Sequence, residues 1–208
     1  MKLVAVVRFV ILVAAAVLII ISMRYPMWYM YLDSNNFPHG IGMSIWATHP
    51  GDPEDISDLD GGLKEINILN HFIGMREISG EMLIFKVLPV VLVLAAIACV
   101  AAALFRRKWT SLAVVILFAA ISVGGVIALV YNLYSFGHHL DPTAAIKIDP
   151  FMPGIYGEYQ LAQFTTYSNF YWGTYLLVMA FLLIVAAWVI DVISFRRGHE
   201  RLNPPSGD

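Results

Sequence analysis

The sequence has few charged residues and a single cysteine. Charged side chains make up 13% of the 208 residues, whereas 59% are hydrophobic and the mean hydropathy is +0.72. Water-soluble domains of ordinary composition do not combine these values. Cys99 is the only cysteine in the sequence, which excludes an internal disulfide. Cysteine content therefore gives no indication of the redox compartment.

The motifs of the common enzyme classes are also missing. The sequence contains no Cys-x-x-Cys pair, no His-Glu-x-x-His helix motif, no Gly-x-Ser-x-Gly elbow and no phosphate loop. The sequence therefore gives little support to an enzyme. We also expect no nucleic-acid partner.

Four long apolar stretches dominate the chain. They cover residues 3–23, 82–105, 110–134 and 169–195. A transmembrane helix needs about 20 mostly apolar residues to cross a hydrocarbon core of about 30 Å, and each stretch reaches that length. The sequence predicts an all-α membrane protein with four transmembrane helices.

The predicted spans hold few ionisable residues. Arg8, Lys86 and Asp191 each lie within about two turns of a span end, where we expect the side chain to reach the interface. A proton pump or charge-coupled transporter is therefore disfavoured. No histidine falls in any predicted span, so we expect no haem held between histidines of this chain's spans.

The basic residues predict the orientation in the membrane. Lysine and arginine are concentrated on the cytoplasmic side of membrane proteins. Three groups of basic residues lie beside the spans on one side of the membrane, namely Lys2 with Arg8, Arg106 to Lys108, and Arg196, Arg197 and Arg201. We expect both termini, including the tail at 196–208, in the cytoplasm and the segments 24–81 and 135–168 outside.

A cleaved signal peptide is the alternative for the first apolar stretch. Its apolar core is longer than the usual ~7–15 residues, and Ser22 to Pro26 offers no small-x-small cleavage site. We therefore expect the stretch to be retained as a span.

The first outer segment is long enough to fold. Residues 25–32 and 40–47 are rich in aromatic and apolar residues, and Asp33 to Asn36 between them favours a turn, so we expect a β-hairpin. An acidic loop follows, to which we assign no function. Apolar residues at Leu63, Ile66 and Leu69 then predict a short amphipathic helix that ends before Gly74. The outer segments together should form a small mixed α/β cap.

Candidate metal ligands lie in both outer segments. His71 lies in the last turn of the predicted short helix with Met75 four residues on, and His138, His139 and Asp141 follow the third span. Imidazole and carboxylate are frequent metal ligands, and a soft thioether suits copper better than magnesium or calcium. Adjacent histidines point apart in a strand, so we expect only one of the pair to face a shared metal.

A purely structural interpretation remains open for these residues. A histidine near a helix end often bonds to backbone carbonyls, and an aspartate before proline often caps the next element. The sequence alone does not decide between a metal site and these structural roles.

At these residues the sequence resembles a family of small bacterial four-span membrane proteins with two outer-loop motifs, Leu-Asn-His-Tyr-Ile-Gly-Met and Gly-His-Asn-Leu-Asp-Pro. The matching segments here are residues 69–75 and 137–142, followed by Ala144 to Ile148. Members of that family resemble products encoded near genes for nitrous-oxide reductase maturation and copper handling.

The resemblance implies an accessory role in copper delivery or metalloenzyme assembly at the bacterial inner membrane. The residues that it implies as metal ligands are His71, Met75, Glu81, Met82, His138 and Asp141. The chain departs from the family pattern at His139, where Asn is expected, and at Phe72, where Tyr is expected.

Two main hypotheses follow for the function. The first is a membrane-anchored accessory protein whose outer His, Met and carboxylate residues bind a metal, with copper expected, for a periplasmic or membrane-bound partner. The second is a structural or assembly subunit of a larger membrane complex without a cofactor of its own. An enzyme that uses a bound metal as Lewis acid is a third, less supported hypothesis.

Overall fold

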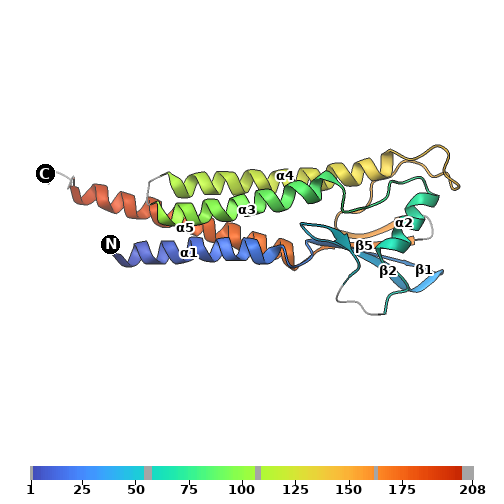
Figure 1. The fold of residues 1–208 in the computed structure, drawn as a ribbon. Helices are drawn as coiled ribbons and strands as arrows, with labels where there is room; N and C mark the ends of the chain where they lie inside the picture. The colour runs from blue at the N-terminus through green and yellow to red at the C-terminus, as the bar shows by residue number, and fades with distance from the viewer. Residues whose placement is uncertain (1, 54–57, 106–108, 162–163, 203–208) are drawn as a thin grey trace. The chain divides into compact units, whose positions relative to one another are not determined.

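The computed structural model describes residues 2–53, 58–105, 109–161 and 164–202, excluding the side chains of Lys2, Ser34, Leu161 and residues 196–202. The basic groups at 106–108 and at 196, 197 and 201 thus lie outside the described side chains. The helices are α1 (Lys2–Ser22), α2 (Leu63–Phe72), α3 (Leu83–Leu104), α4 (Thr110–His138) and α5 (Trp172–Leu202). The strands are β1 (Trp28–Ser34), β2 (Phe37–Ile45), β3 (Pro50–Gly51), β4 (Gly157–Leu161) and β5 (Phe164–Phe170) (Figure 1).

Four of these helices are long and apolar enough to cross a membrane. The candidate spans are Leu3–Ser22, Leu83–Leu104, Thr110–His138 and Trp172–Phe195. The helices satisfy their backbone hydrogen bonds internally, which the hydrocarbon core requires. The predicted set of four long apolar helices is therefore confirmed, together with a fifth, short helix and a small antiparallel sheet in the described residues.

The bounds of the third and fourth helices differ from the sequence prediction. Helix α4 continues four residues past Tyr134 to His138, and the His139 N–H still donates to the Ser135 carbonyl oxygen at 3.1 Å. Helix α5 begins at Trp172 because Asn169 and Phe170 still belong to β5, where they pair with β1. Apolar and polar residues are mixed at the end of α4 and at the start of α5. Hydropathy alone therefore placed these two boundaries about one helical turn from their observed positions.

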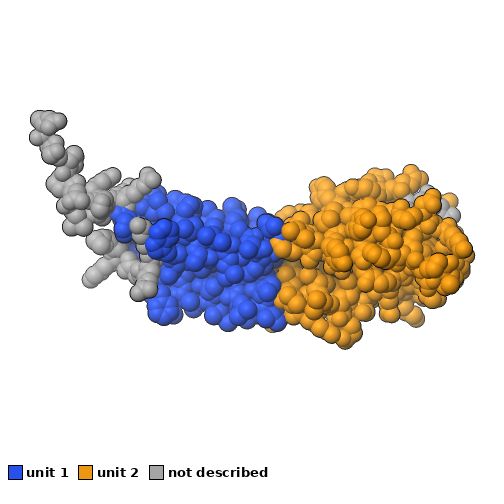
Figure 2. Space-filling model, turned by 90° about the horizontal axis from the view of Figure 1, so that it is seen from above, with its two compact units in different colours: residues 1–21, 90–123, 176–208 blue, residues 22–89, 124–175 orange. Residues whose placement is uncertain are grey.

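The chain divides into two compact units, which Figure 2 shows in different colours. Unit 1 comprises residues 1–21, 90–123 and 176–208, and unit 2 comprises residues 22–89 and 124–175. The regular secondary structure described in unit 1 is entirely helical. Unit 2 contains the sheet, α2 and the adjoining parts of the long helices, so the outer segments of the sequence fold together in it.

The sheet of unit 2 has five antiparallel strands in the order β3-β2-β1-β5-β4. The predicted hairpin is confirmed as β1 and β2, which are joined by a tight turn at Asn35 and Asn36. On its other side, β1 pairs with β5, and Trp28 lies opposite both Ile45 and Phe170. The β4–β5 hairpin, which the sequence did not predict, thus joins the second outer segment to the first.

One face of the sheet packs against α2 around a small hydrophobic core. The buried members of this core cluster are Trp28, Ile41, Met43, Ile66, Ile78 and Phe136. Trp28 also donates its indole N–H to the carbonyl oxygen of Ile155 at 2.7 Å. Because Phe136 and Ile155 come from the second outer segment, the core is built from both segments.

Helix α2 is confirmed where the sequence predicted it, and specific contacts hold both of its ends. Glu65 accepts the Gly62 N–H at 2.8 Å, and this bond lowers the pKa of the Glu65 carboxyl. Asp52 accepts the Leu63 N–H at 2.7 Å, so two carboxylates occupy the positive end of the helix. Beyond the other end, Gly74 has a φ of +81°, a conformation that favours glycine.

The two outer segments meet directly behind α2. Asp141 donates its N–H to the Gly74 carbonyl oxygen at 2.8 Å, and Ile146 donates to the Phe72 carbonyl oxygen at 2.9 Å. Arg76 bonds to the Ser135 hydroxyl at 2.9 Å, and its guanidinium lies 5.0 Å from the centre of the Phe136 ring. The end of α2 is therefore fixed by residues about 70 positions further along the chain.

We predict that Gly74→Ala destabilises unit 2. The new Cβ would lie 2.8 Å from the Asp141 nitrogen and 2.9 Å from its carbonyl oxygen, in addition to the cost of a positive φ. We expect a loss of about 1–3 kcal/mol, measured as a lower melting temperature of the protein in detergent.

Gly125→Ala is the matched control because a Cβ at Gly125 meets nothing within 4 Å and the residue lies inside α4. This variant should melt at the wild-type temperature or slightly above it. Equal melting temperatures for the two variants would contradict the account of the Gly74 position.

Candidate functional site

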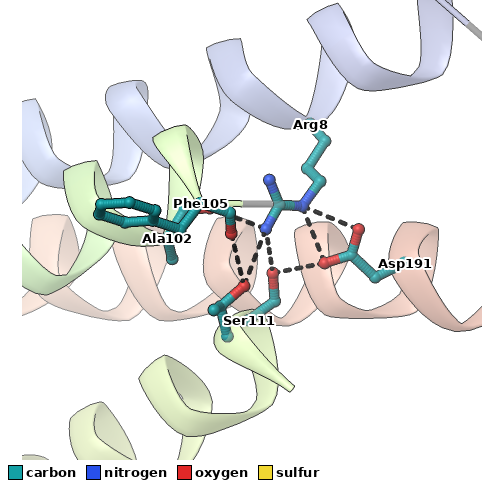
Figure 3. A network of polar contacts seen from close by, with 6 residues as sticks. Arg8, Ala102, Phe105, Ser111 and Asp191 are labelled. Carbon is teal, nitrogen blue, oxygen red and sulfur yellow. Dashed lines mark hydrogen bonds and ion pairs between the residues drawn. The ribbon is translucent and has the colours of Figure 1, made fainter. Parts of the chain in front are cut away.

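Unit 1 contains a buried ion pair that the sequence analysis missed (Figure 3). Arg8 on α1 is only 3% exposed, and its Nε lies 2.8 Å from the carboxylate of Asp191 on α5. We expected both side chains to extend to the interface separately. They instead turn toward each other, because an unpaired charge in an apolar surrounding is costly.

The same guanidinium connects the remaining two long helices. Arg8 Nη2 donates to the carbonyl oxygen of Ala102 on α3 at 2.8 Å and to the hydroxyl of Ser111 on α4 at 3.0 Å. Ser111 in turn donates to the Asp191 carboxylate. One arginine thus links all four long helices, and every one of these contacts lies within unit 1. This arrangement is suited to holding the helices together.

The sequence contained a pattern from which the pairing of Arg8 with Asp191 could have been predicted. Arg8 and Asp191 carry opposite charges on the first and last spans, near the ends that the predicted topology puts on one side. Lys86, the third ionisable residue of the predicted spans, behaves differently. It forms an exposed pair with Glu81 at 2.6 Å, with side chains that are 58% and 87% exposed.

The hollow next to α2 in unit 2 is the strongest candidate for a binding site. It has a volume of about 810 Å³ and opens to solvent. Its walls are one side of α2, the chain segment after it, and the end of β3 with Asp52. The lining residues are Gly51, Asp52, Leu63, Lys64, Asn67, Ile68, His71, Phe72, Met75, Glu77, Ile78 and Ser79.

Two hydrogen bonds from one side chain connect α2 to the chain segment after it, beside this hollow. The Asn67 amide accepts the Ile78 N–H at 2.9 Å and donates to the Ile78 carbonyl oxygen at 3.0 Å. Ile66 and Ile78 are buried in the core cluster beneath. The hollow therefore has a fixed floor and an open mouth.

Two of the predicted metal ligands, His71 and Met75, line this one hollow. The His71 ring is exposed and makes no hydrogen bond with any described residue. Met75 is half-buried, and it also packs against the core cluster. An imidazole and a thioether are therefore accessible from the same space.

His138 and His139 are held at the end of α4 instead of in a strand. The Nδ1 of His138 lies 3.0 Å from the Tyr134 carbonyl oxygen, and its ring stacks on the Tyr134 ring with centroids 3.8 Å apart. The Nδ1 of His139 lies 3.2 Å from the Ser135 carbonyl oxygen. These bonds to the last helical turn correspond to the structural alternative that the sequence left open.

Asp141 organises a turn next to α2. Its Oδ1 accepts the Thr143 hydroxyl at 2.7 Å and the Thr143 N–H at 2.8 Å. These two bonds hold the pKa of the Asp141 carboxyl below its ordinary value, and the charge of His71 lowers this pKa further. Asp141 and His71, which are 70 positions apart in the chain, are thus electrostatic neighbours.

Glu81 and Met82 have other contacts. The Lys86 ammonium beside Glu81 lowers the pKa of that carboxyl, and Met82 packs against the core cluster. Among the described residues, no group of three or more His, Cys, Asp or Glu side chains is arranged to hold a metal ion. Of the six predicted ligands, only His71 and Met75 are brought to the hollow.

Comparison with known proteins does not identify the chain further. No protein-family model matches it, and no curated protein has a matching sequence.

We predict that the buried ion pair of unit 1 contributes much more to stability than the exposed pair does. Arg8→Met should lower the free energy of unfolding in mixed micelles by about 3 kcal/mol, because it leaves the Asp191 carboxylate without its main partner. Asp191→Asn should also destabilise, and the double variant should lose less than the sum of the two.

Lys86→Met provides the matched control, because it removes the cation of the exposed pair. Solvent screens that pair, so we expect no measurable change in the free energy of unfolding. Additive effects of Arg8→Met and Asp191→Asn would contradict a direct interaction between the two residues.

Proposed function

We propose that the protein is a membrane-anchored accessory protein that binds copper(I) through His71 and Met75 in the α2 hollow and presents it to a partner. The support is that an imidazole whose ring bonds to no described residue and a thioether both line one open hollow. Thioether sulfur is a soft ligand, which favours copper(I) over magnesium or calcium. Few ligands and an open mouth suit transfer of an ion better than its storage.

Glu81, Met82, His138 and Asp141 have no direct part in this proposal. Asp141 contributes by holding the end of α2 through its N–H bond to Gly74, while its carboxylate stays close to His71. The resemblance to proteins encoded near copper-handling genes agrees with this function.

We further propose that the protein lies in a bacterial inner membrane with both termini in the cytoplasm and the hollow outside. The support is the distribution of lysine and arginine in the sequence, which groups basic residues beside the ends that bear the termini. In this orientation the hollow faces the compartment of periplasmic partners.

Cysteine labelling tests this orientation. In a Cys99→Ala background, a membrane-impermeant maleimide should label His39→Cys in intact spheroplasts and Ser206→Cys only after lysis. Labelling of Ser206→Cys in intact spheroplasts would contradict the proposed topology.

The metal proposal is tested on the purified full chain in detergent. Silver(I), a redox-silent stand-in for copper(I), should bind at one equivalent, and His71→Ala should weaken its binding by about 10–100-fold. Met75→Leu, which keeps the apolar packing and removes the sulfur, should weaken it similarly. Isothermal titration calorimetry measures both.

His39→Ala is the control, since His39 is an exposed histidine of unit 2 that does not line the hollow. It should bind silver(I) as the wild type does. Wild-type binding by His71→Ala would rule out the proposed site.

The second candidate function is a structural or assembly subunit without its own cofactor. It is supported by the exposed apolar side chains Ile68 and Phe72, which lie in the same unit as the sheet. In this case the complex that co-purifies with the protein would remain intact in His71→Ala. The purified complex would contain no metal bound by this chain.

A further inference from the structure

The α2 hollow is far larger than a metal ion requires. Its volume of about 810 Å³ falls in the range of about 300–1,000 Å³ that is typical of pockets for drug-sized molecules. A single ion between His71 and Met75 would leave most of this space open. The hollow therefore has room for an occupant of several side chains.

The lining of the hollow next to His71 is apolar. Ile68 and Phe72 remain 47% and 46% exposed, and Leu63 and Ile78 also contribute to the walls. Ile68 and Phe72 thus offer an occupant exposed apolar side chains to contact. The lining has three charged residues: Asp52, which is already bonded to the Leu63 N–H at the start of α2, and Lys64 and Glu77, which supply one further charge of each sign. This near balance favours an occupant without a strong net charge.

The described ligands would complete only one side of a metal ion. His71 and Met75 would give two donors, so a bound ion would have coordination positions left for other ligands. Asp52 already accepts the Leu63 N–H, and carboxylates such as that of Glu77 are hard ligands that suit copper(I) poorly. A further soft ligand has to come from the occupant.

We infer that the hollow docks a short, uncharged segment of a partner protein, whose apolar side chains contact Ile68 and Phe72 while its methionine sulfur completes the coordination of the metal. This inference rests on the proposed copper function. It specifies how the partner is recognised: the apolar wall and the metal act together, so that neither alone gives tight binding. The metal binds and is released without any change in its oxidation state.

The test uses the full chain in detergent with silver(I) and two labelled nine-residue peptides. One peptide has a central methionine between leucine and phenylalanine and no charged side chain. In the other, norleucine replaces the methionine, which removes the sulfur and keeps the shape. Because both peptides enter micelles alike, the difference between them measures the metal contact. Fluorescence anisotropy is measured with and without silver(I), for wild type, His71→Ala and His39→Ala.

With silver(I) present, we expect wild type and His39→Ala to bind the methionine peptide at least about tenfold more tightly than the norleucine peptide. This difference should vanish without silver(I). It should also be absent in His71→Ala. Silver(I) binding without this difference would overturn the inference and leave the proposed function standing. Equal binding of both peptides without metal would mark a plain apolar docking surface and also overturn it. If the chain binds no silver(I), the inference and the proposed function both fail.

Discussion

Strand β1 is the element on which unit 2 depends. It follows α1 directly and is hydrogen-bonded on both sides, to β2 from its own hairpin and to β5 from the far end of the second outer segment. Trp28 at its start packs in the core cluster and donates to the Ile155 carbonyl oxygen. The pairing between β1 and β5 joins the two outer segments through the sheet, in addition to the hydrogen bonds between them behind α2.

The features that the sequence predicted are those set by local rules. Four stretches of about 20 apolar residues identify helices because a helix satisfies its own backbone inside a membrane. The turn at Asn35 and Asn36 and the repeat of Leu63, Ile66 and Leu69 likewise predicted the hairpin and α2. Each of these patterns lies within one short stretch of chain.

The features that the sequence did not predict depend on distant residues. Trp28 pairs in the sheet with Phe170, more than 140 positions away in the sequence. Arg8 pairs with Asp191 across more than 180 positions. No local pattern reveals such a partner. The candidate site divides in the same way. Local spacing suggested that His71 and Met75 could act together, whereas the packing of Met82 in the core and the pairing of Glu81 with Lys86 appear only in the structure.

The proposed copper site is therefore smaller than the sequence predicted and more dependent on a partner. The most direct test is X-ray absorption spectroscopy at the copper edge on the purified chain loaded with one equivalent of copper(I). The account predicts a coordination shell with imidazole nitrogen and sulfur, from which the sulfur disappears in Met75→Leu. A shell of oxygen alone, or copper that does not stay bound, would contradict it.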